Sequence, residues 1–466
     1  MAIRNRLKII PWAILIFALF ISCSSLSTQK GFYDPINADL LEGEYDSAVV
    51  KLENARENNK FADKDRFLYY LDAGLANYYA ANFDSSNAKL TQAENSAEEL
   101  FTRSISRAAL SYVINDNVLE YPGEDYEVLY TNIFKALNYL AMDNAEDAFV
   151  EVRRANLKLE LLEQKYVDLA QQFQKTADED TVLSGLKYEA PDVRFNNDAF
   201  ARYLGMHLYA SRGDYDNARI AYDYLVNAFQ SQPDVYDFPM PDVKYYSENG
   251  YILSVVALSG RAPVKEALNL RLRTDKDLNL VQILYDGPDS SDTEYGHLPV
   301  PVSEDYYFKF AIPMLIERPS QIDRVFVKIN GEVAGQLQLI EDIGKVSRET
   351  YEARKTLMYI RTLARAIVKG LFAHKAKEKA DTGGLGGWLK KAAIDVGTDI
   401  LENADLRCSR LLPNRIYVSD LELEPGVYDI TFEFVDSEGN IVASKSVEGY
   451  RVLENGLNLV QAFSLR

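Results

Sequence analysis

The residue types that most often perform chemistry are sparse and scattered in this sequence. The histidines, His207, His297 and His374, lie far apart, and none has the His-Glu-x-x-His spacing of a zinc site. No Gly-x-Ser-x-Gly motif marks a nucleophilic serine. Carboxylates are abundant enough to form a glycosidase pair, but no two of them stand out by position. We therefore expect no metal, no cofactor and no enzymatic activity.

Cys23 is the residue whose surroundings most clearly indicate a modification. Three basic residues among the first eight precede an apolar run from Ile9 to Ile21, and Ser22 stands directly before Cys23. This order is typical of a secretory signal peptide, here residues 1–22. The stretch resembles the bacterial lipobox, with Phe20 in place of the usual leucine. The resemblance implies that Cys23 is acylated and becomes the first residue of the mature protein. An uncleaved N-terminal membrane anchor is the alternative.

The residues after Cys23 and the overall charge indicate where the protein works. Residues 23–34 are interpreted as the lipidated cysteine and a polar tether. Ser24, rather than an aspartate, follows the cysteine, and resemblance to bacterial sorting rules favours the outer membrane, facing the periplasm. The formal charge of −19 excludes nucleic acid as a ligand, so acyl chains must provide the membrane attachment. Cys408 has no second cysteine to pair with once Cys23 is acylated.

A repeated pattern of small, aliphatic and aromatic residues occupies residues 35–232. It starts at Tyr45, Phe83, Ala145 and Tyr215 and continues at offsets of 3, 7 and 10. These offsets lie on one face of a helix, and small residues there let a neighbouring helix approach closely. A helix, a tight turn and a second helix with such a face resemble the tetratricopeptide repeat (TPR). We predict an irregular, TPR-like all-α solenoid; an ordinary helical bundle is the alternative.

One of these repeat helices carries polar residues that a purely packing helix does not need, namely Arg153, Arg154 and Asn156. Repeat solenoids present concave grooves that bind extended peptides or helices. Arginines bind carboxylates through paired hydrogen bonds. We predict that Arg153, Arg154 and Asn156 bind acidic side chains of a protein partner in the groove. Two simply exposed arginines are the alternative.

The second half of the chain has the residue pattern of β-strands. Prolines at 233, 239 and 241 make residues 233–241 a linker. Runs rich in Val, Ile, Leu and Tyr then predict strands at 251–258, 268–272, 280–285, 306–312, 324–329, 332–339, 417–423, 428–435, 441–447 and 457–465. Asn330-Gly331 is a strong hairpin signal. Residues 242–466 are thus predicted to form a β-rich, sandwich-like domain, giving a multidomain α+β fold.

An inserted helical pair is predicted at residues 349–404 within this domain. The segment from Thr356 to Trp388 is basic in an otherwise acidic protein, and its apolar face includes Phe372 and Trp388. We predict that Phe372 and Trp388 dock a partner. A core helix with a solvated basic face is the alternative.

Short motifs along the chain carry a resemblance to a family of uncharacterised bacterial lipoproteins with a TPR-like N-terminal half. They are DYEVLY from Asp125, VRRAN from Val152, APVK from Ala262, TLARAI from Thr362 and ADLR from Ala404. The resemblance implies lipid attachment, this two-part layout and no established reaction. It also implies an association with lipoproteins that activate cell-wall synthases.

Together these features predict a cell-envelope lipoprotein that acts as a non-enzymatic scaffold or adaptor. Its protein partner would bind in the helical-repeat groove, in a process linked to cell-wall synthesis. The first alternative is a peptidoglycan- or glycan-binding module, in which some of the 31 tyrosines stack on sugar rings. The second alternative is an envelope hydrolase, which requires a carboxylate pair that the sequence does not reveal.

Overall fold

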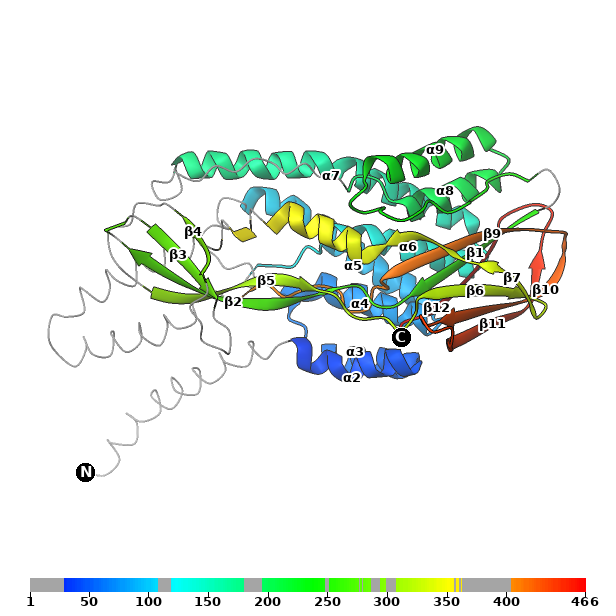
Figure 1. Ribbon diagram of the computed structural model, residues 1–466, viewed down its shortest axis with the longest axis horizontal. Coiled ribbons are helices and arrows are strands. Elements are labelled where there is room, and N and C mark those ends of the chain that lie inside the picture. The colour runs from blue at the N-terminus through cyan, green and yellow to red at the C-terminus, as the bar shows by residue number, and fades with distance from the viewer. Residues whose placement is uncertain are drawn as a thin grey trace, which may run out of the picture.

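The structure, a computed structural model, places helices in the first half of the chain and strands in the second (Figure 1). It describes residues 29–107, 119–179, 195–247, 251–275, 277–278, 280–285, 294–298, 307–355, 358–359, 362 and 404–466. The predicted order of helices followed by strands is confirmed.

The described helices of the first half form consecutive pairs. They are α2 (Gln29–Glu42) with α3 (Tyr45–Glu57), α4 (Arg66–Tyr79) with α5 (Phe83–Arg107), α6 (Asp125–Ala141) with α7 (Ala145–Glu179), and α8 (Ala199–Ala210) with α9 (Tyr215–Ser231). The second helix of each pair begins where the repeated sequence motif starts. Its small residues at offset 3, such as Ala48 and Ala148, are fully buried. The motif therefore marks the buried face of each second helix.

The turns within these pairs share one backbone geometry. A residue with positive φ stands in each of them: Gly43, Ala81, Asp143 and Gly213. The next N–H donates to the carbonyl five residues earlier, over 2.8 to 3.1 Å. This is the Schellman arrangement, which satisfies carbonyls at a helix end and reverses the chain. The helix pairs are thus copies of one helix–turn–helix unit, although their spacing along the sequence is irregular.

A four-stranded sheet covers α4, α6 and α8, the first helices of the last three pairs; we call it the central sheet. Its order is β12 (Asn458–Ser464), β1 (Tyr251–Ser259), β9 (Arg415–Leu423) and β8 (Gln338–Asp342). Helices α4, α6 and α8 are buried around almost their whole circumference. Their apolar side chains form one continuous core with Val256, Leu258 and Val418 of the central sheet. The inner face of the helical layer is therefore occupied by the chain itself.

Strand β1 is buried on both faces. Its alternate residues Leu253, Val255 and Ala257 point away from the helices and pack on a second sheet. This outer sheet has the order β11 (Ile441–Val452), β10 (Gly426–Val435), β6 (Arg324–Ile329) and β7 (Glu332–Gln336). The molecule thus has layers of helices, central sheet and outer sheet. Burial on two sides explains why β1 reads as a continuous apolar run rather than an alternating one.

The chain crosses between the two sheets where the sequence predicted a single strand over 332–339. Strand β6 turns into β7 through Asn330 and Gly331, both with positive φ, as the hairpin signal predicts. At Leu337 the chain leaves the outer sheet, and β8 continues in the central sheet. Prediction of one strand here was wrong, because Leu337 is buried in the core between the sheets and the chain bends around it.

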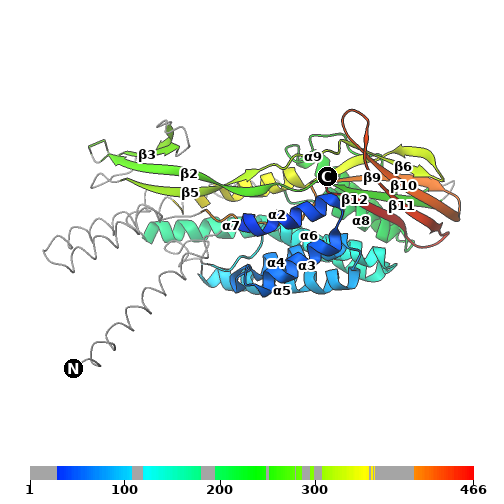
Figure 2. The same ribbon diagram turned by 90° about the horizontal axis from the view of Figure 1, so that it is seen from below.

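A third sheet lies at the opposite end of the molecule from the outer sheet (Figure 2). We call it the arm sheet; its order is β4 (Glu294–Leu298), β3 (Leu280–Tyr285), β2 (Val264–Asp275) and β5 (Tyr307–Ile316). Strand β4 was missing from the sequence prediction. Strands β2 and β5 pair from Val264 opposite Ile316 to Arg273 opposite Tyr307.

The predicted linker and helical insert are described only in part. Residues 233–241 contain no helix or strand, but Val235 and Tyr236 are buried in the core. The segment therefore packs against the layers that it connects. A helix spans residues 343–355 and so begins before the predicted boundary at 349. Most of the predicted insert lies outside the described residues.

Candidate functional site

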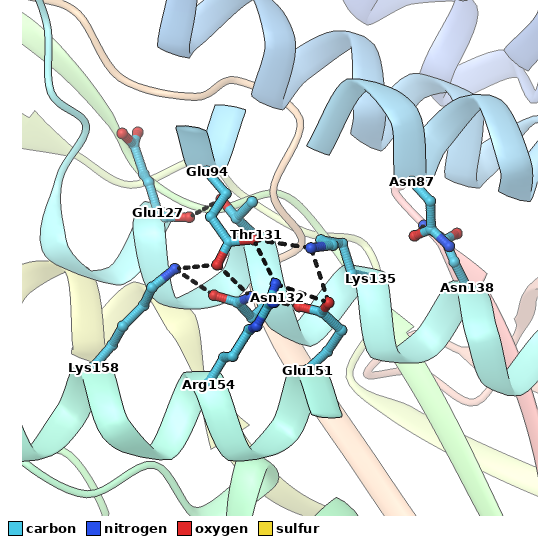
Figure 3. Close-up of polar contacts among 10 residues, drawn as sticks. All are labelled: Asn87, Glu94, Glu127, Thr131, Asn132, Lys135, Asn138, Glu151, Arg154 and Lys158. Carbon is cyan, nitrogen blue, oxygen red and sulfur yellow. Dashed lines mark hydrogen bonds and ion pairs between the residues drawn. The ribbon is translucent and has the colours of Figure 1, made fainter. Parts of the chain in front are cut away.

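A buried cluster of charged side chains joins α5, α6 and α7 (Figure 3). Its members are Glu94 from α5, Asn132 and Lys135 from α6, and Glu151, Arg154 and Lys158 from α7. We call it the charge cluster. Lys135 Nζ lies 2.9 Å from a carboxylate oxygen of Glu94 and 2.9 Å from one of Glu151. Lys158 Nζ lies 2.9 Å from the other oxygen of Glu94. Lys135 therefore bridges Glu94 and Glu151, and Glu94 is also paired with Lys158.

The charge cluster keeps Glu94 ionised. Burial alone would raise the pKa of Glu94, but the nearby charge of Lys158 and the hydrogen bonds from Lys135 and Asn132 lower it to about 2. Asn132 donates to Glu94 at 2.9 Å and to Glu151 at 2.6 Å. Glu94 and Glu151 are thus paired with lysines without any contribution from Arg154.

Arg154 is the further cation. Its Nη1 lies 3.5 Å from Glu94 and 3.4 Å from Glu151, longer than a good charged hydrogen bond. Its side chain is 52 % exposed. Two carboxylates face three basic side chains in the charge cluster, so the positive charge of Arg154 exceeds what the acids require. The guanidinium is held near the acids but remains open to solvent.

The other two residues predicted on this helix have different surroundings. Arg153 is exposed, and its guanidinium lies 5.9 Å from the centre of the Phe149 ring. Asn156 is partly buried, and its Oδ1 lacks a hydrogen-bond partner within the described part of the chain. The structure brings Arg153 and Arg154 together on α7, in the outer row of helices rather than against the central sheet. Their role in binding stays a prediction.

An exposed apolar stripe runs along the same side of α7; we call it the α7 stripe. It consists of Val150, Leu157 and Leu161, which are 45 %, 56 % and 59 % exposed. Offsets of 7 and 11 place the three side chains on one line along a helix. The sequence prediction missed these residues because it followed the buried face. A second apolar line on α7, away from the core positions, is the signal that would have found them.

Helix α5 shows that such a stripe is not a general property of the outer helices. Its exposed positions from 84 to 99 carry Asp84, Ser85, Ala88, Gln92, Asn95, Glu98 and Glu99. All of these are polar, charged or small. Aliphatic side chains in a row on a solvent-facing helix are typical of interaction sites.

A second buried polar cluster lies where α4 and α6 meet β2 and the segment 404–410; we call it the junction. Glu124 pairs with Lys265 at the start of β2 and with Arg354, whose Nη1 is 2.6 Å away. Arg407 binds Asp65 at 2.9 Å and Asp405 at 2.7 Å. The motifs from Asp125, Ala262 and Ala404 therefore converge in space. The junction fastens the base of the arm sheet to the helices.

Two junction carboxyl groups have raised pKa values. Burial and the charge of Glu124 raise the pKa of Glu127 to about 7. Burial raises the pKa of Asp72 to about 6. Glu127 accepts hydrogen bonds from Tyr121 at 2.7 Å and from the N–H of Ser409 at 2.5 Å. Cys408 is buried beside them, and burial raises the pKa of its thiol to about 11, so this thiol is unreactive at neutral pH.

The N-terminus of α8 holds a pair of buried carboxyl groups, the feature closest to what a hydrolase requires. Asp198 accepts from the N–H of Ala201 at 2.7 Å, and Glu341 of β8 accepts from the N–H of Phe200 at 3.3 Å. Burial raises the pKa of both groups. Both side chains are fully buried and accept backbone N–H groups at the start of the helix.

Several predicted residues and features lie beyond what the structure describes. Cys23, Phe372 and Trp388 fall outside the described residues, so lipidation of Cys23 and docking by Phe372 and Trp388 stay predictions. Among the residues described, no group of three or more His, Cys, Asp or Glu side chains is arranged to hold a metal ion. Within the same part of the chain, no helix has the length and apolarity needed to cross a membrane.

Comparison with known proteins adds no assignment. No model of a protein family matches this sequence, and a search of curated proteins finds no matching relative. The interpretation of the site therefore rests on its residues and their geometry.

Proposed function

We propose that this protein is a lipid-anchored scaffold or adaptor of the bacterial cell envelope that binds a protein partner and performs no catalysis itself. The observation that carries the proposal is the α7 stripe, a row of aliphatic side chains exposed beside two arginines. Exposed apolar rows rimmed by polar residues serve as binding surfaces. The recurring Schellman turns support the finer proposal that the helical layer is TPR-like.

The location and process are proposed from the sequence. A signal peptide with Cys23 at its end would anchor the protein by acyl chains, most simply to the outer membrane and facing the periplasm. The resemblance to a lipoprotein family supports a role near cell-wall synthesis. The acidic composition supports attachment through acyl chains rather than through charge.

The surface for the partner differs from the groove that the sequence analysis favoured. In a repeat solenoid the first helices of the pairs usually line the groove. Here the central sheet covers α4, α6 and α8, so a peptide does not have access to that face. The predicted residues Arg153 and Arg154 lie on an outer helix instead. We therefore place the partner on the outer face of α7.

Photo-crosslinking in cells tests this proposal. A photoreactive amino acid at Leu157, in the α7 stripe, should give one recurrent protein adduct, identified by mass spectrometry. The matched control is the same amino acid at Asn95, an exposed position on α5. Equal adducts at both positions, or none at Leu157, would contradict the proposed surface.

A glycan-binding module is the second candidate, because Tyr215 and Tyr246 are 49 % and 55 % exposed and their rings lie 5.6 Å apart. Exposed aromatic rings stack on sugars. Co-sedimentation with purified peptidoglycan separates the two functions. Binding that is lost in Tyr215→Ala and kept in Leu157→Ser would favour the glycan.

A further inference from the structure

We infer that the outer face of α7 binds an amphipathic helix whose polar edge is acidic, presented by the partner protein. The inference rests on the proposed function and specifies the chemistry of its partner. It follows from the charges of the exposed face, from the spacing of its apolar residues and from the poor fit of other occupants.

The charge of the exposed α7 face favours an acidic ligand. The exposed positions between 150 and 161 of α7 are Val150, Arg153, Arg154, Leu157, Glu160 and Leu161. Glu160 interacts electrostatically with Arg202 of α8, so its charge is already opposed within the protein. The acids near Arg154 are paired with Lys135 and Lys158. In the described part of the chain no carboxylate forms an ion pair with Arg153. The face therefore carries a local positive charge on a strongly acidic protein.

Arg154 is held in position before any ligand binds. Its Nη1 lies within 3.5 Å of Glu94 and 3.4 Å of Glu151, which limits where the guanidinium can point. Half of its side chain nevertheless faces solvent. A carboxylate from outside can approach the open edge of this guanidinium and form the paired hydrogen bonds that arginine favours. Holding the side chain in advance reduces the conformational entropy lost on binding.

The apolar residues of the α7 stripe are spaced as in a contact between two helices. With a rise of about 1.5 Å per residue, Val150 and Leu157 are separated by about 10 Å and Leu157 and Leu161 by about 6 Å. This spacing matches aliphatic side chains at positions i, i+7 and i+11 of a second helix laid parallel to α7, or at i, i+4 and i+11 of an antiparallel one. Acidic residues flanking that apolar line would then meet Arg153 and Arg154.

A second copy of this chain fits the face less well. A symmetric pair places the same surface on both molecules. Arg153 and Arg154 of one copy would then approach the same arginines of the other, and such like-charge contacts oppose association. A lipid surface also fits less well, because the protein as a whole is acidic.

The test measures binding of synthetic helical peptides of about 18 residues to the full chain purified in detergent. The acidic peptide carries leucines on one line and glutamates beside it. The second peptide replaces each glutamate with lysine, and the third scrambles the acidic sequence. We expect the acidic peptide to bind at least about tenfold more tightly than either of the others, by fluorescence anisotropy.

Two variants of the protein sharpen the test. Arg153→Glu combined with Arg154→Glu should reverse the preference toward the lysine peptide, and added salt should weaken binding to the unaltered protein. Leu157→Ser should weaken binding of the acidic peptide about tenfold. Circular dichroism establishes that both variants keep the fold. Equal affinity for the acidic and scrambled peptides, or an unchanged preference in the double variant, would overturn the inference.

Other occupants give distinct results. A dimer that dissociates with Leu157→Ser would assign the face to a second copy, and lipid adducts at a photoreactive residue 157 would assign it to the membrane; either overturns the inference. Recurrent protein adducts at residue 157 with no preference for the acidic peptide would leave the scaffold function in place and refute only the acidic chemistry.

Discussion

The two buried polar clusters of this protein differ in how their surroundings shift the pKa of their acidic groups. In the charge cluster, lysines lower the pKa of Glu94 to about 2, and a surplus arginine faces solvent. In the junction, Arg354 and Arg407 lower the pKa of Glu124 and of Asp405 despite burial, whereas burial raises the pKa of Glu127 to about 7 and that of Asp72 to about 6. The charge cluster is open on one side and presents charge to the outside. The junction is closed and joins the two halves of the chain.

The largest loss of stability is expected from a substitution in the junction. Arg407→Met leaves Asp65 and Asp405 buried without their shared cation, which should lower the free energy of unfolding by about 3–5 kcal/mol. The matched control is Arg451→Met on exposed β11, with an expected change below about 0.5 kcal/mol. Urea denaturation followed by circular dichroism measures both. Similar values for the two variants would mean that the junction contributes little to holding the halves together.

The opposite pKa shifts predict an optimum in stability against pH. Glu127 and Asp72 bind a proton more tightly in the folded than in the unfolded protein, because their folded pKa values are raised. Their contribution to stability is therefore complete only below about pH 4 and is lost as pH rises from about 4 through 6 and 7, by up to about 3 kcal/mol for Glu127. Glu94, whose pKa is lowered, acts oppositely and loses its contribution as pH falls from about 4.5 to 2.

Urea midpoints between pH 3 and pH 8 measure this profile. We expect a maximum near pH 4, where the gain from Glu94 balances the losses from Asp72 and Glu127. A midpoint that rises steadily from pH 5 to pH 8 would show that the junction carboxyl groups are ionised in the folded protein.

A comparison of Lys158 and Arg154, two cations of α7, tests whether the positive charge of Arg154 exceeds what the acids of the charge cluster require. Lys158→Met removes a close partner of Glu94 and should lower the free energy of unfolding by about 1–3 kcal/mol. Arg154→Met removes the half-exposed cation and should change it by less than about 1 kcal/mol. If Arg154→Met proved the more damaging, its guanidinium would be required for the fold and not available for a ligand.

The smallest effect is expected on the α7 stripe. Leu157→Ser should change the free energy of unfolding by no more than about 0.5 kcal/mol, because Leu157 is mostly exposed. Leu159→Ala, two residues away on the buried face, should lower it by about 2–5 kcal/mol. Thermal melts of the two variants make the comparison. A large loss with Leu157→Ser would place Leu157 in the core.

The sequence predicted the local elements well and the contacts between them poorly. The repeated motif located the starts of α3, α5, α7 and α9, because helix periodicity and turn residues are local properties. The strand over 332–339 was predicted as one, since the bend at Leu337 depends on a core formed by other strands. Strand β1 is rich in apolar residues because both of its faces are buried, but the sequence does not reveal which layers cover them.

Only the local part of the candidate site could be predicted from the sequence, because its remaining features depend on contacts between elements. Arg153 and Arg154 are adjacent in sequence, so their joint placement was predictable. The excess positive charge on this face could not be predicted, because it depends on the ion pair between Lys135 of α6 and Glu94 of α5. A binding groove was predicted by analogy with repeat proteins, but the sheet that covers the inner helices comes from residues far along the chain.

The pairing of β1 with β12 has a consequence for how the protein is made. The two strands run parallel, from Leu253 opposite Asn458 to Ser259 opposite Ser464. During synthesis the inner helices therefore emerge long before the last strand of the sheet that covers them. Until residue 464 is available, their apolar faces are open to chaperones and to other nascent chains. A truncation within β12 should therefore expose the helical layer to aggregation and proteolysis, even though every helix would still be present.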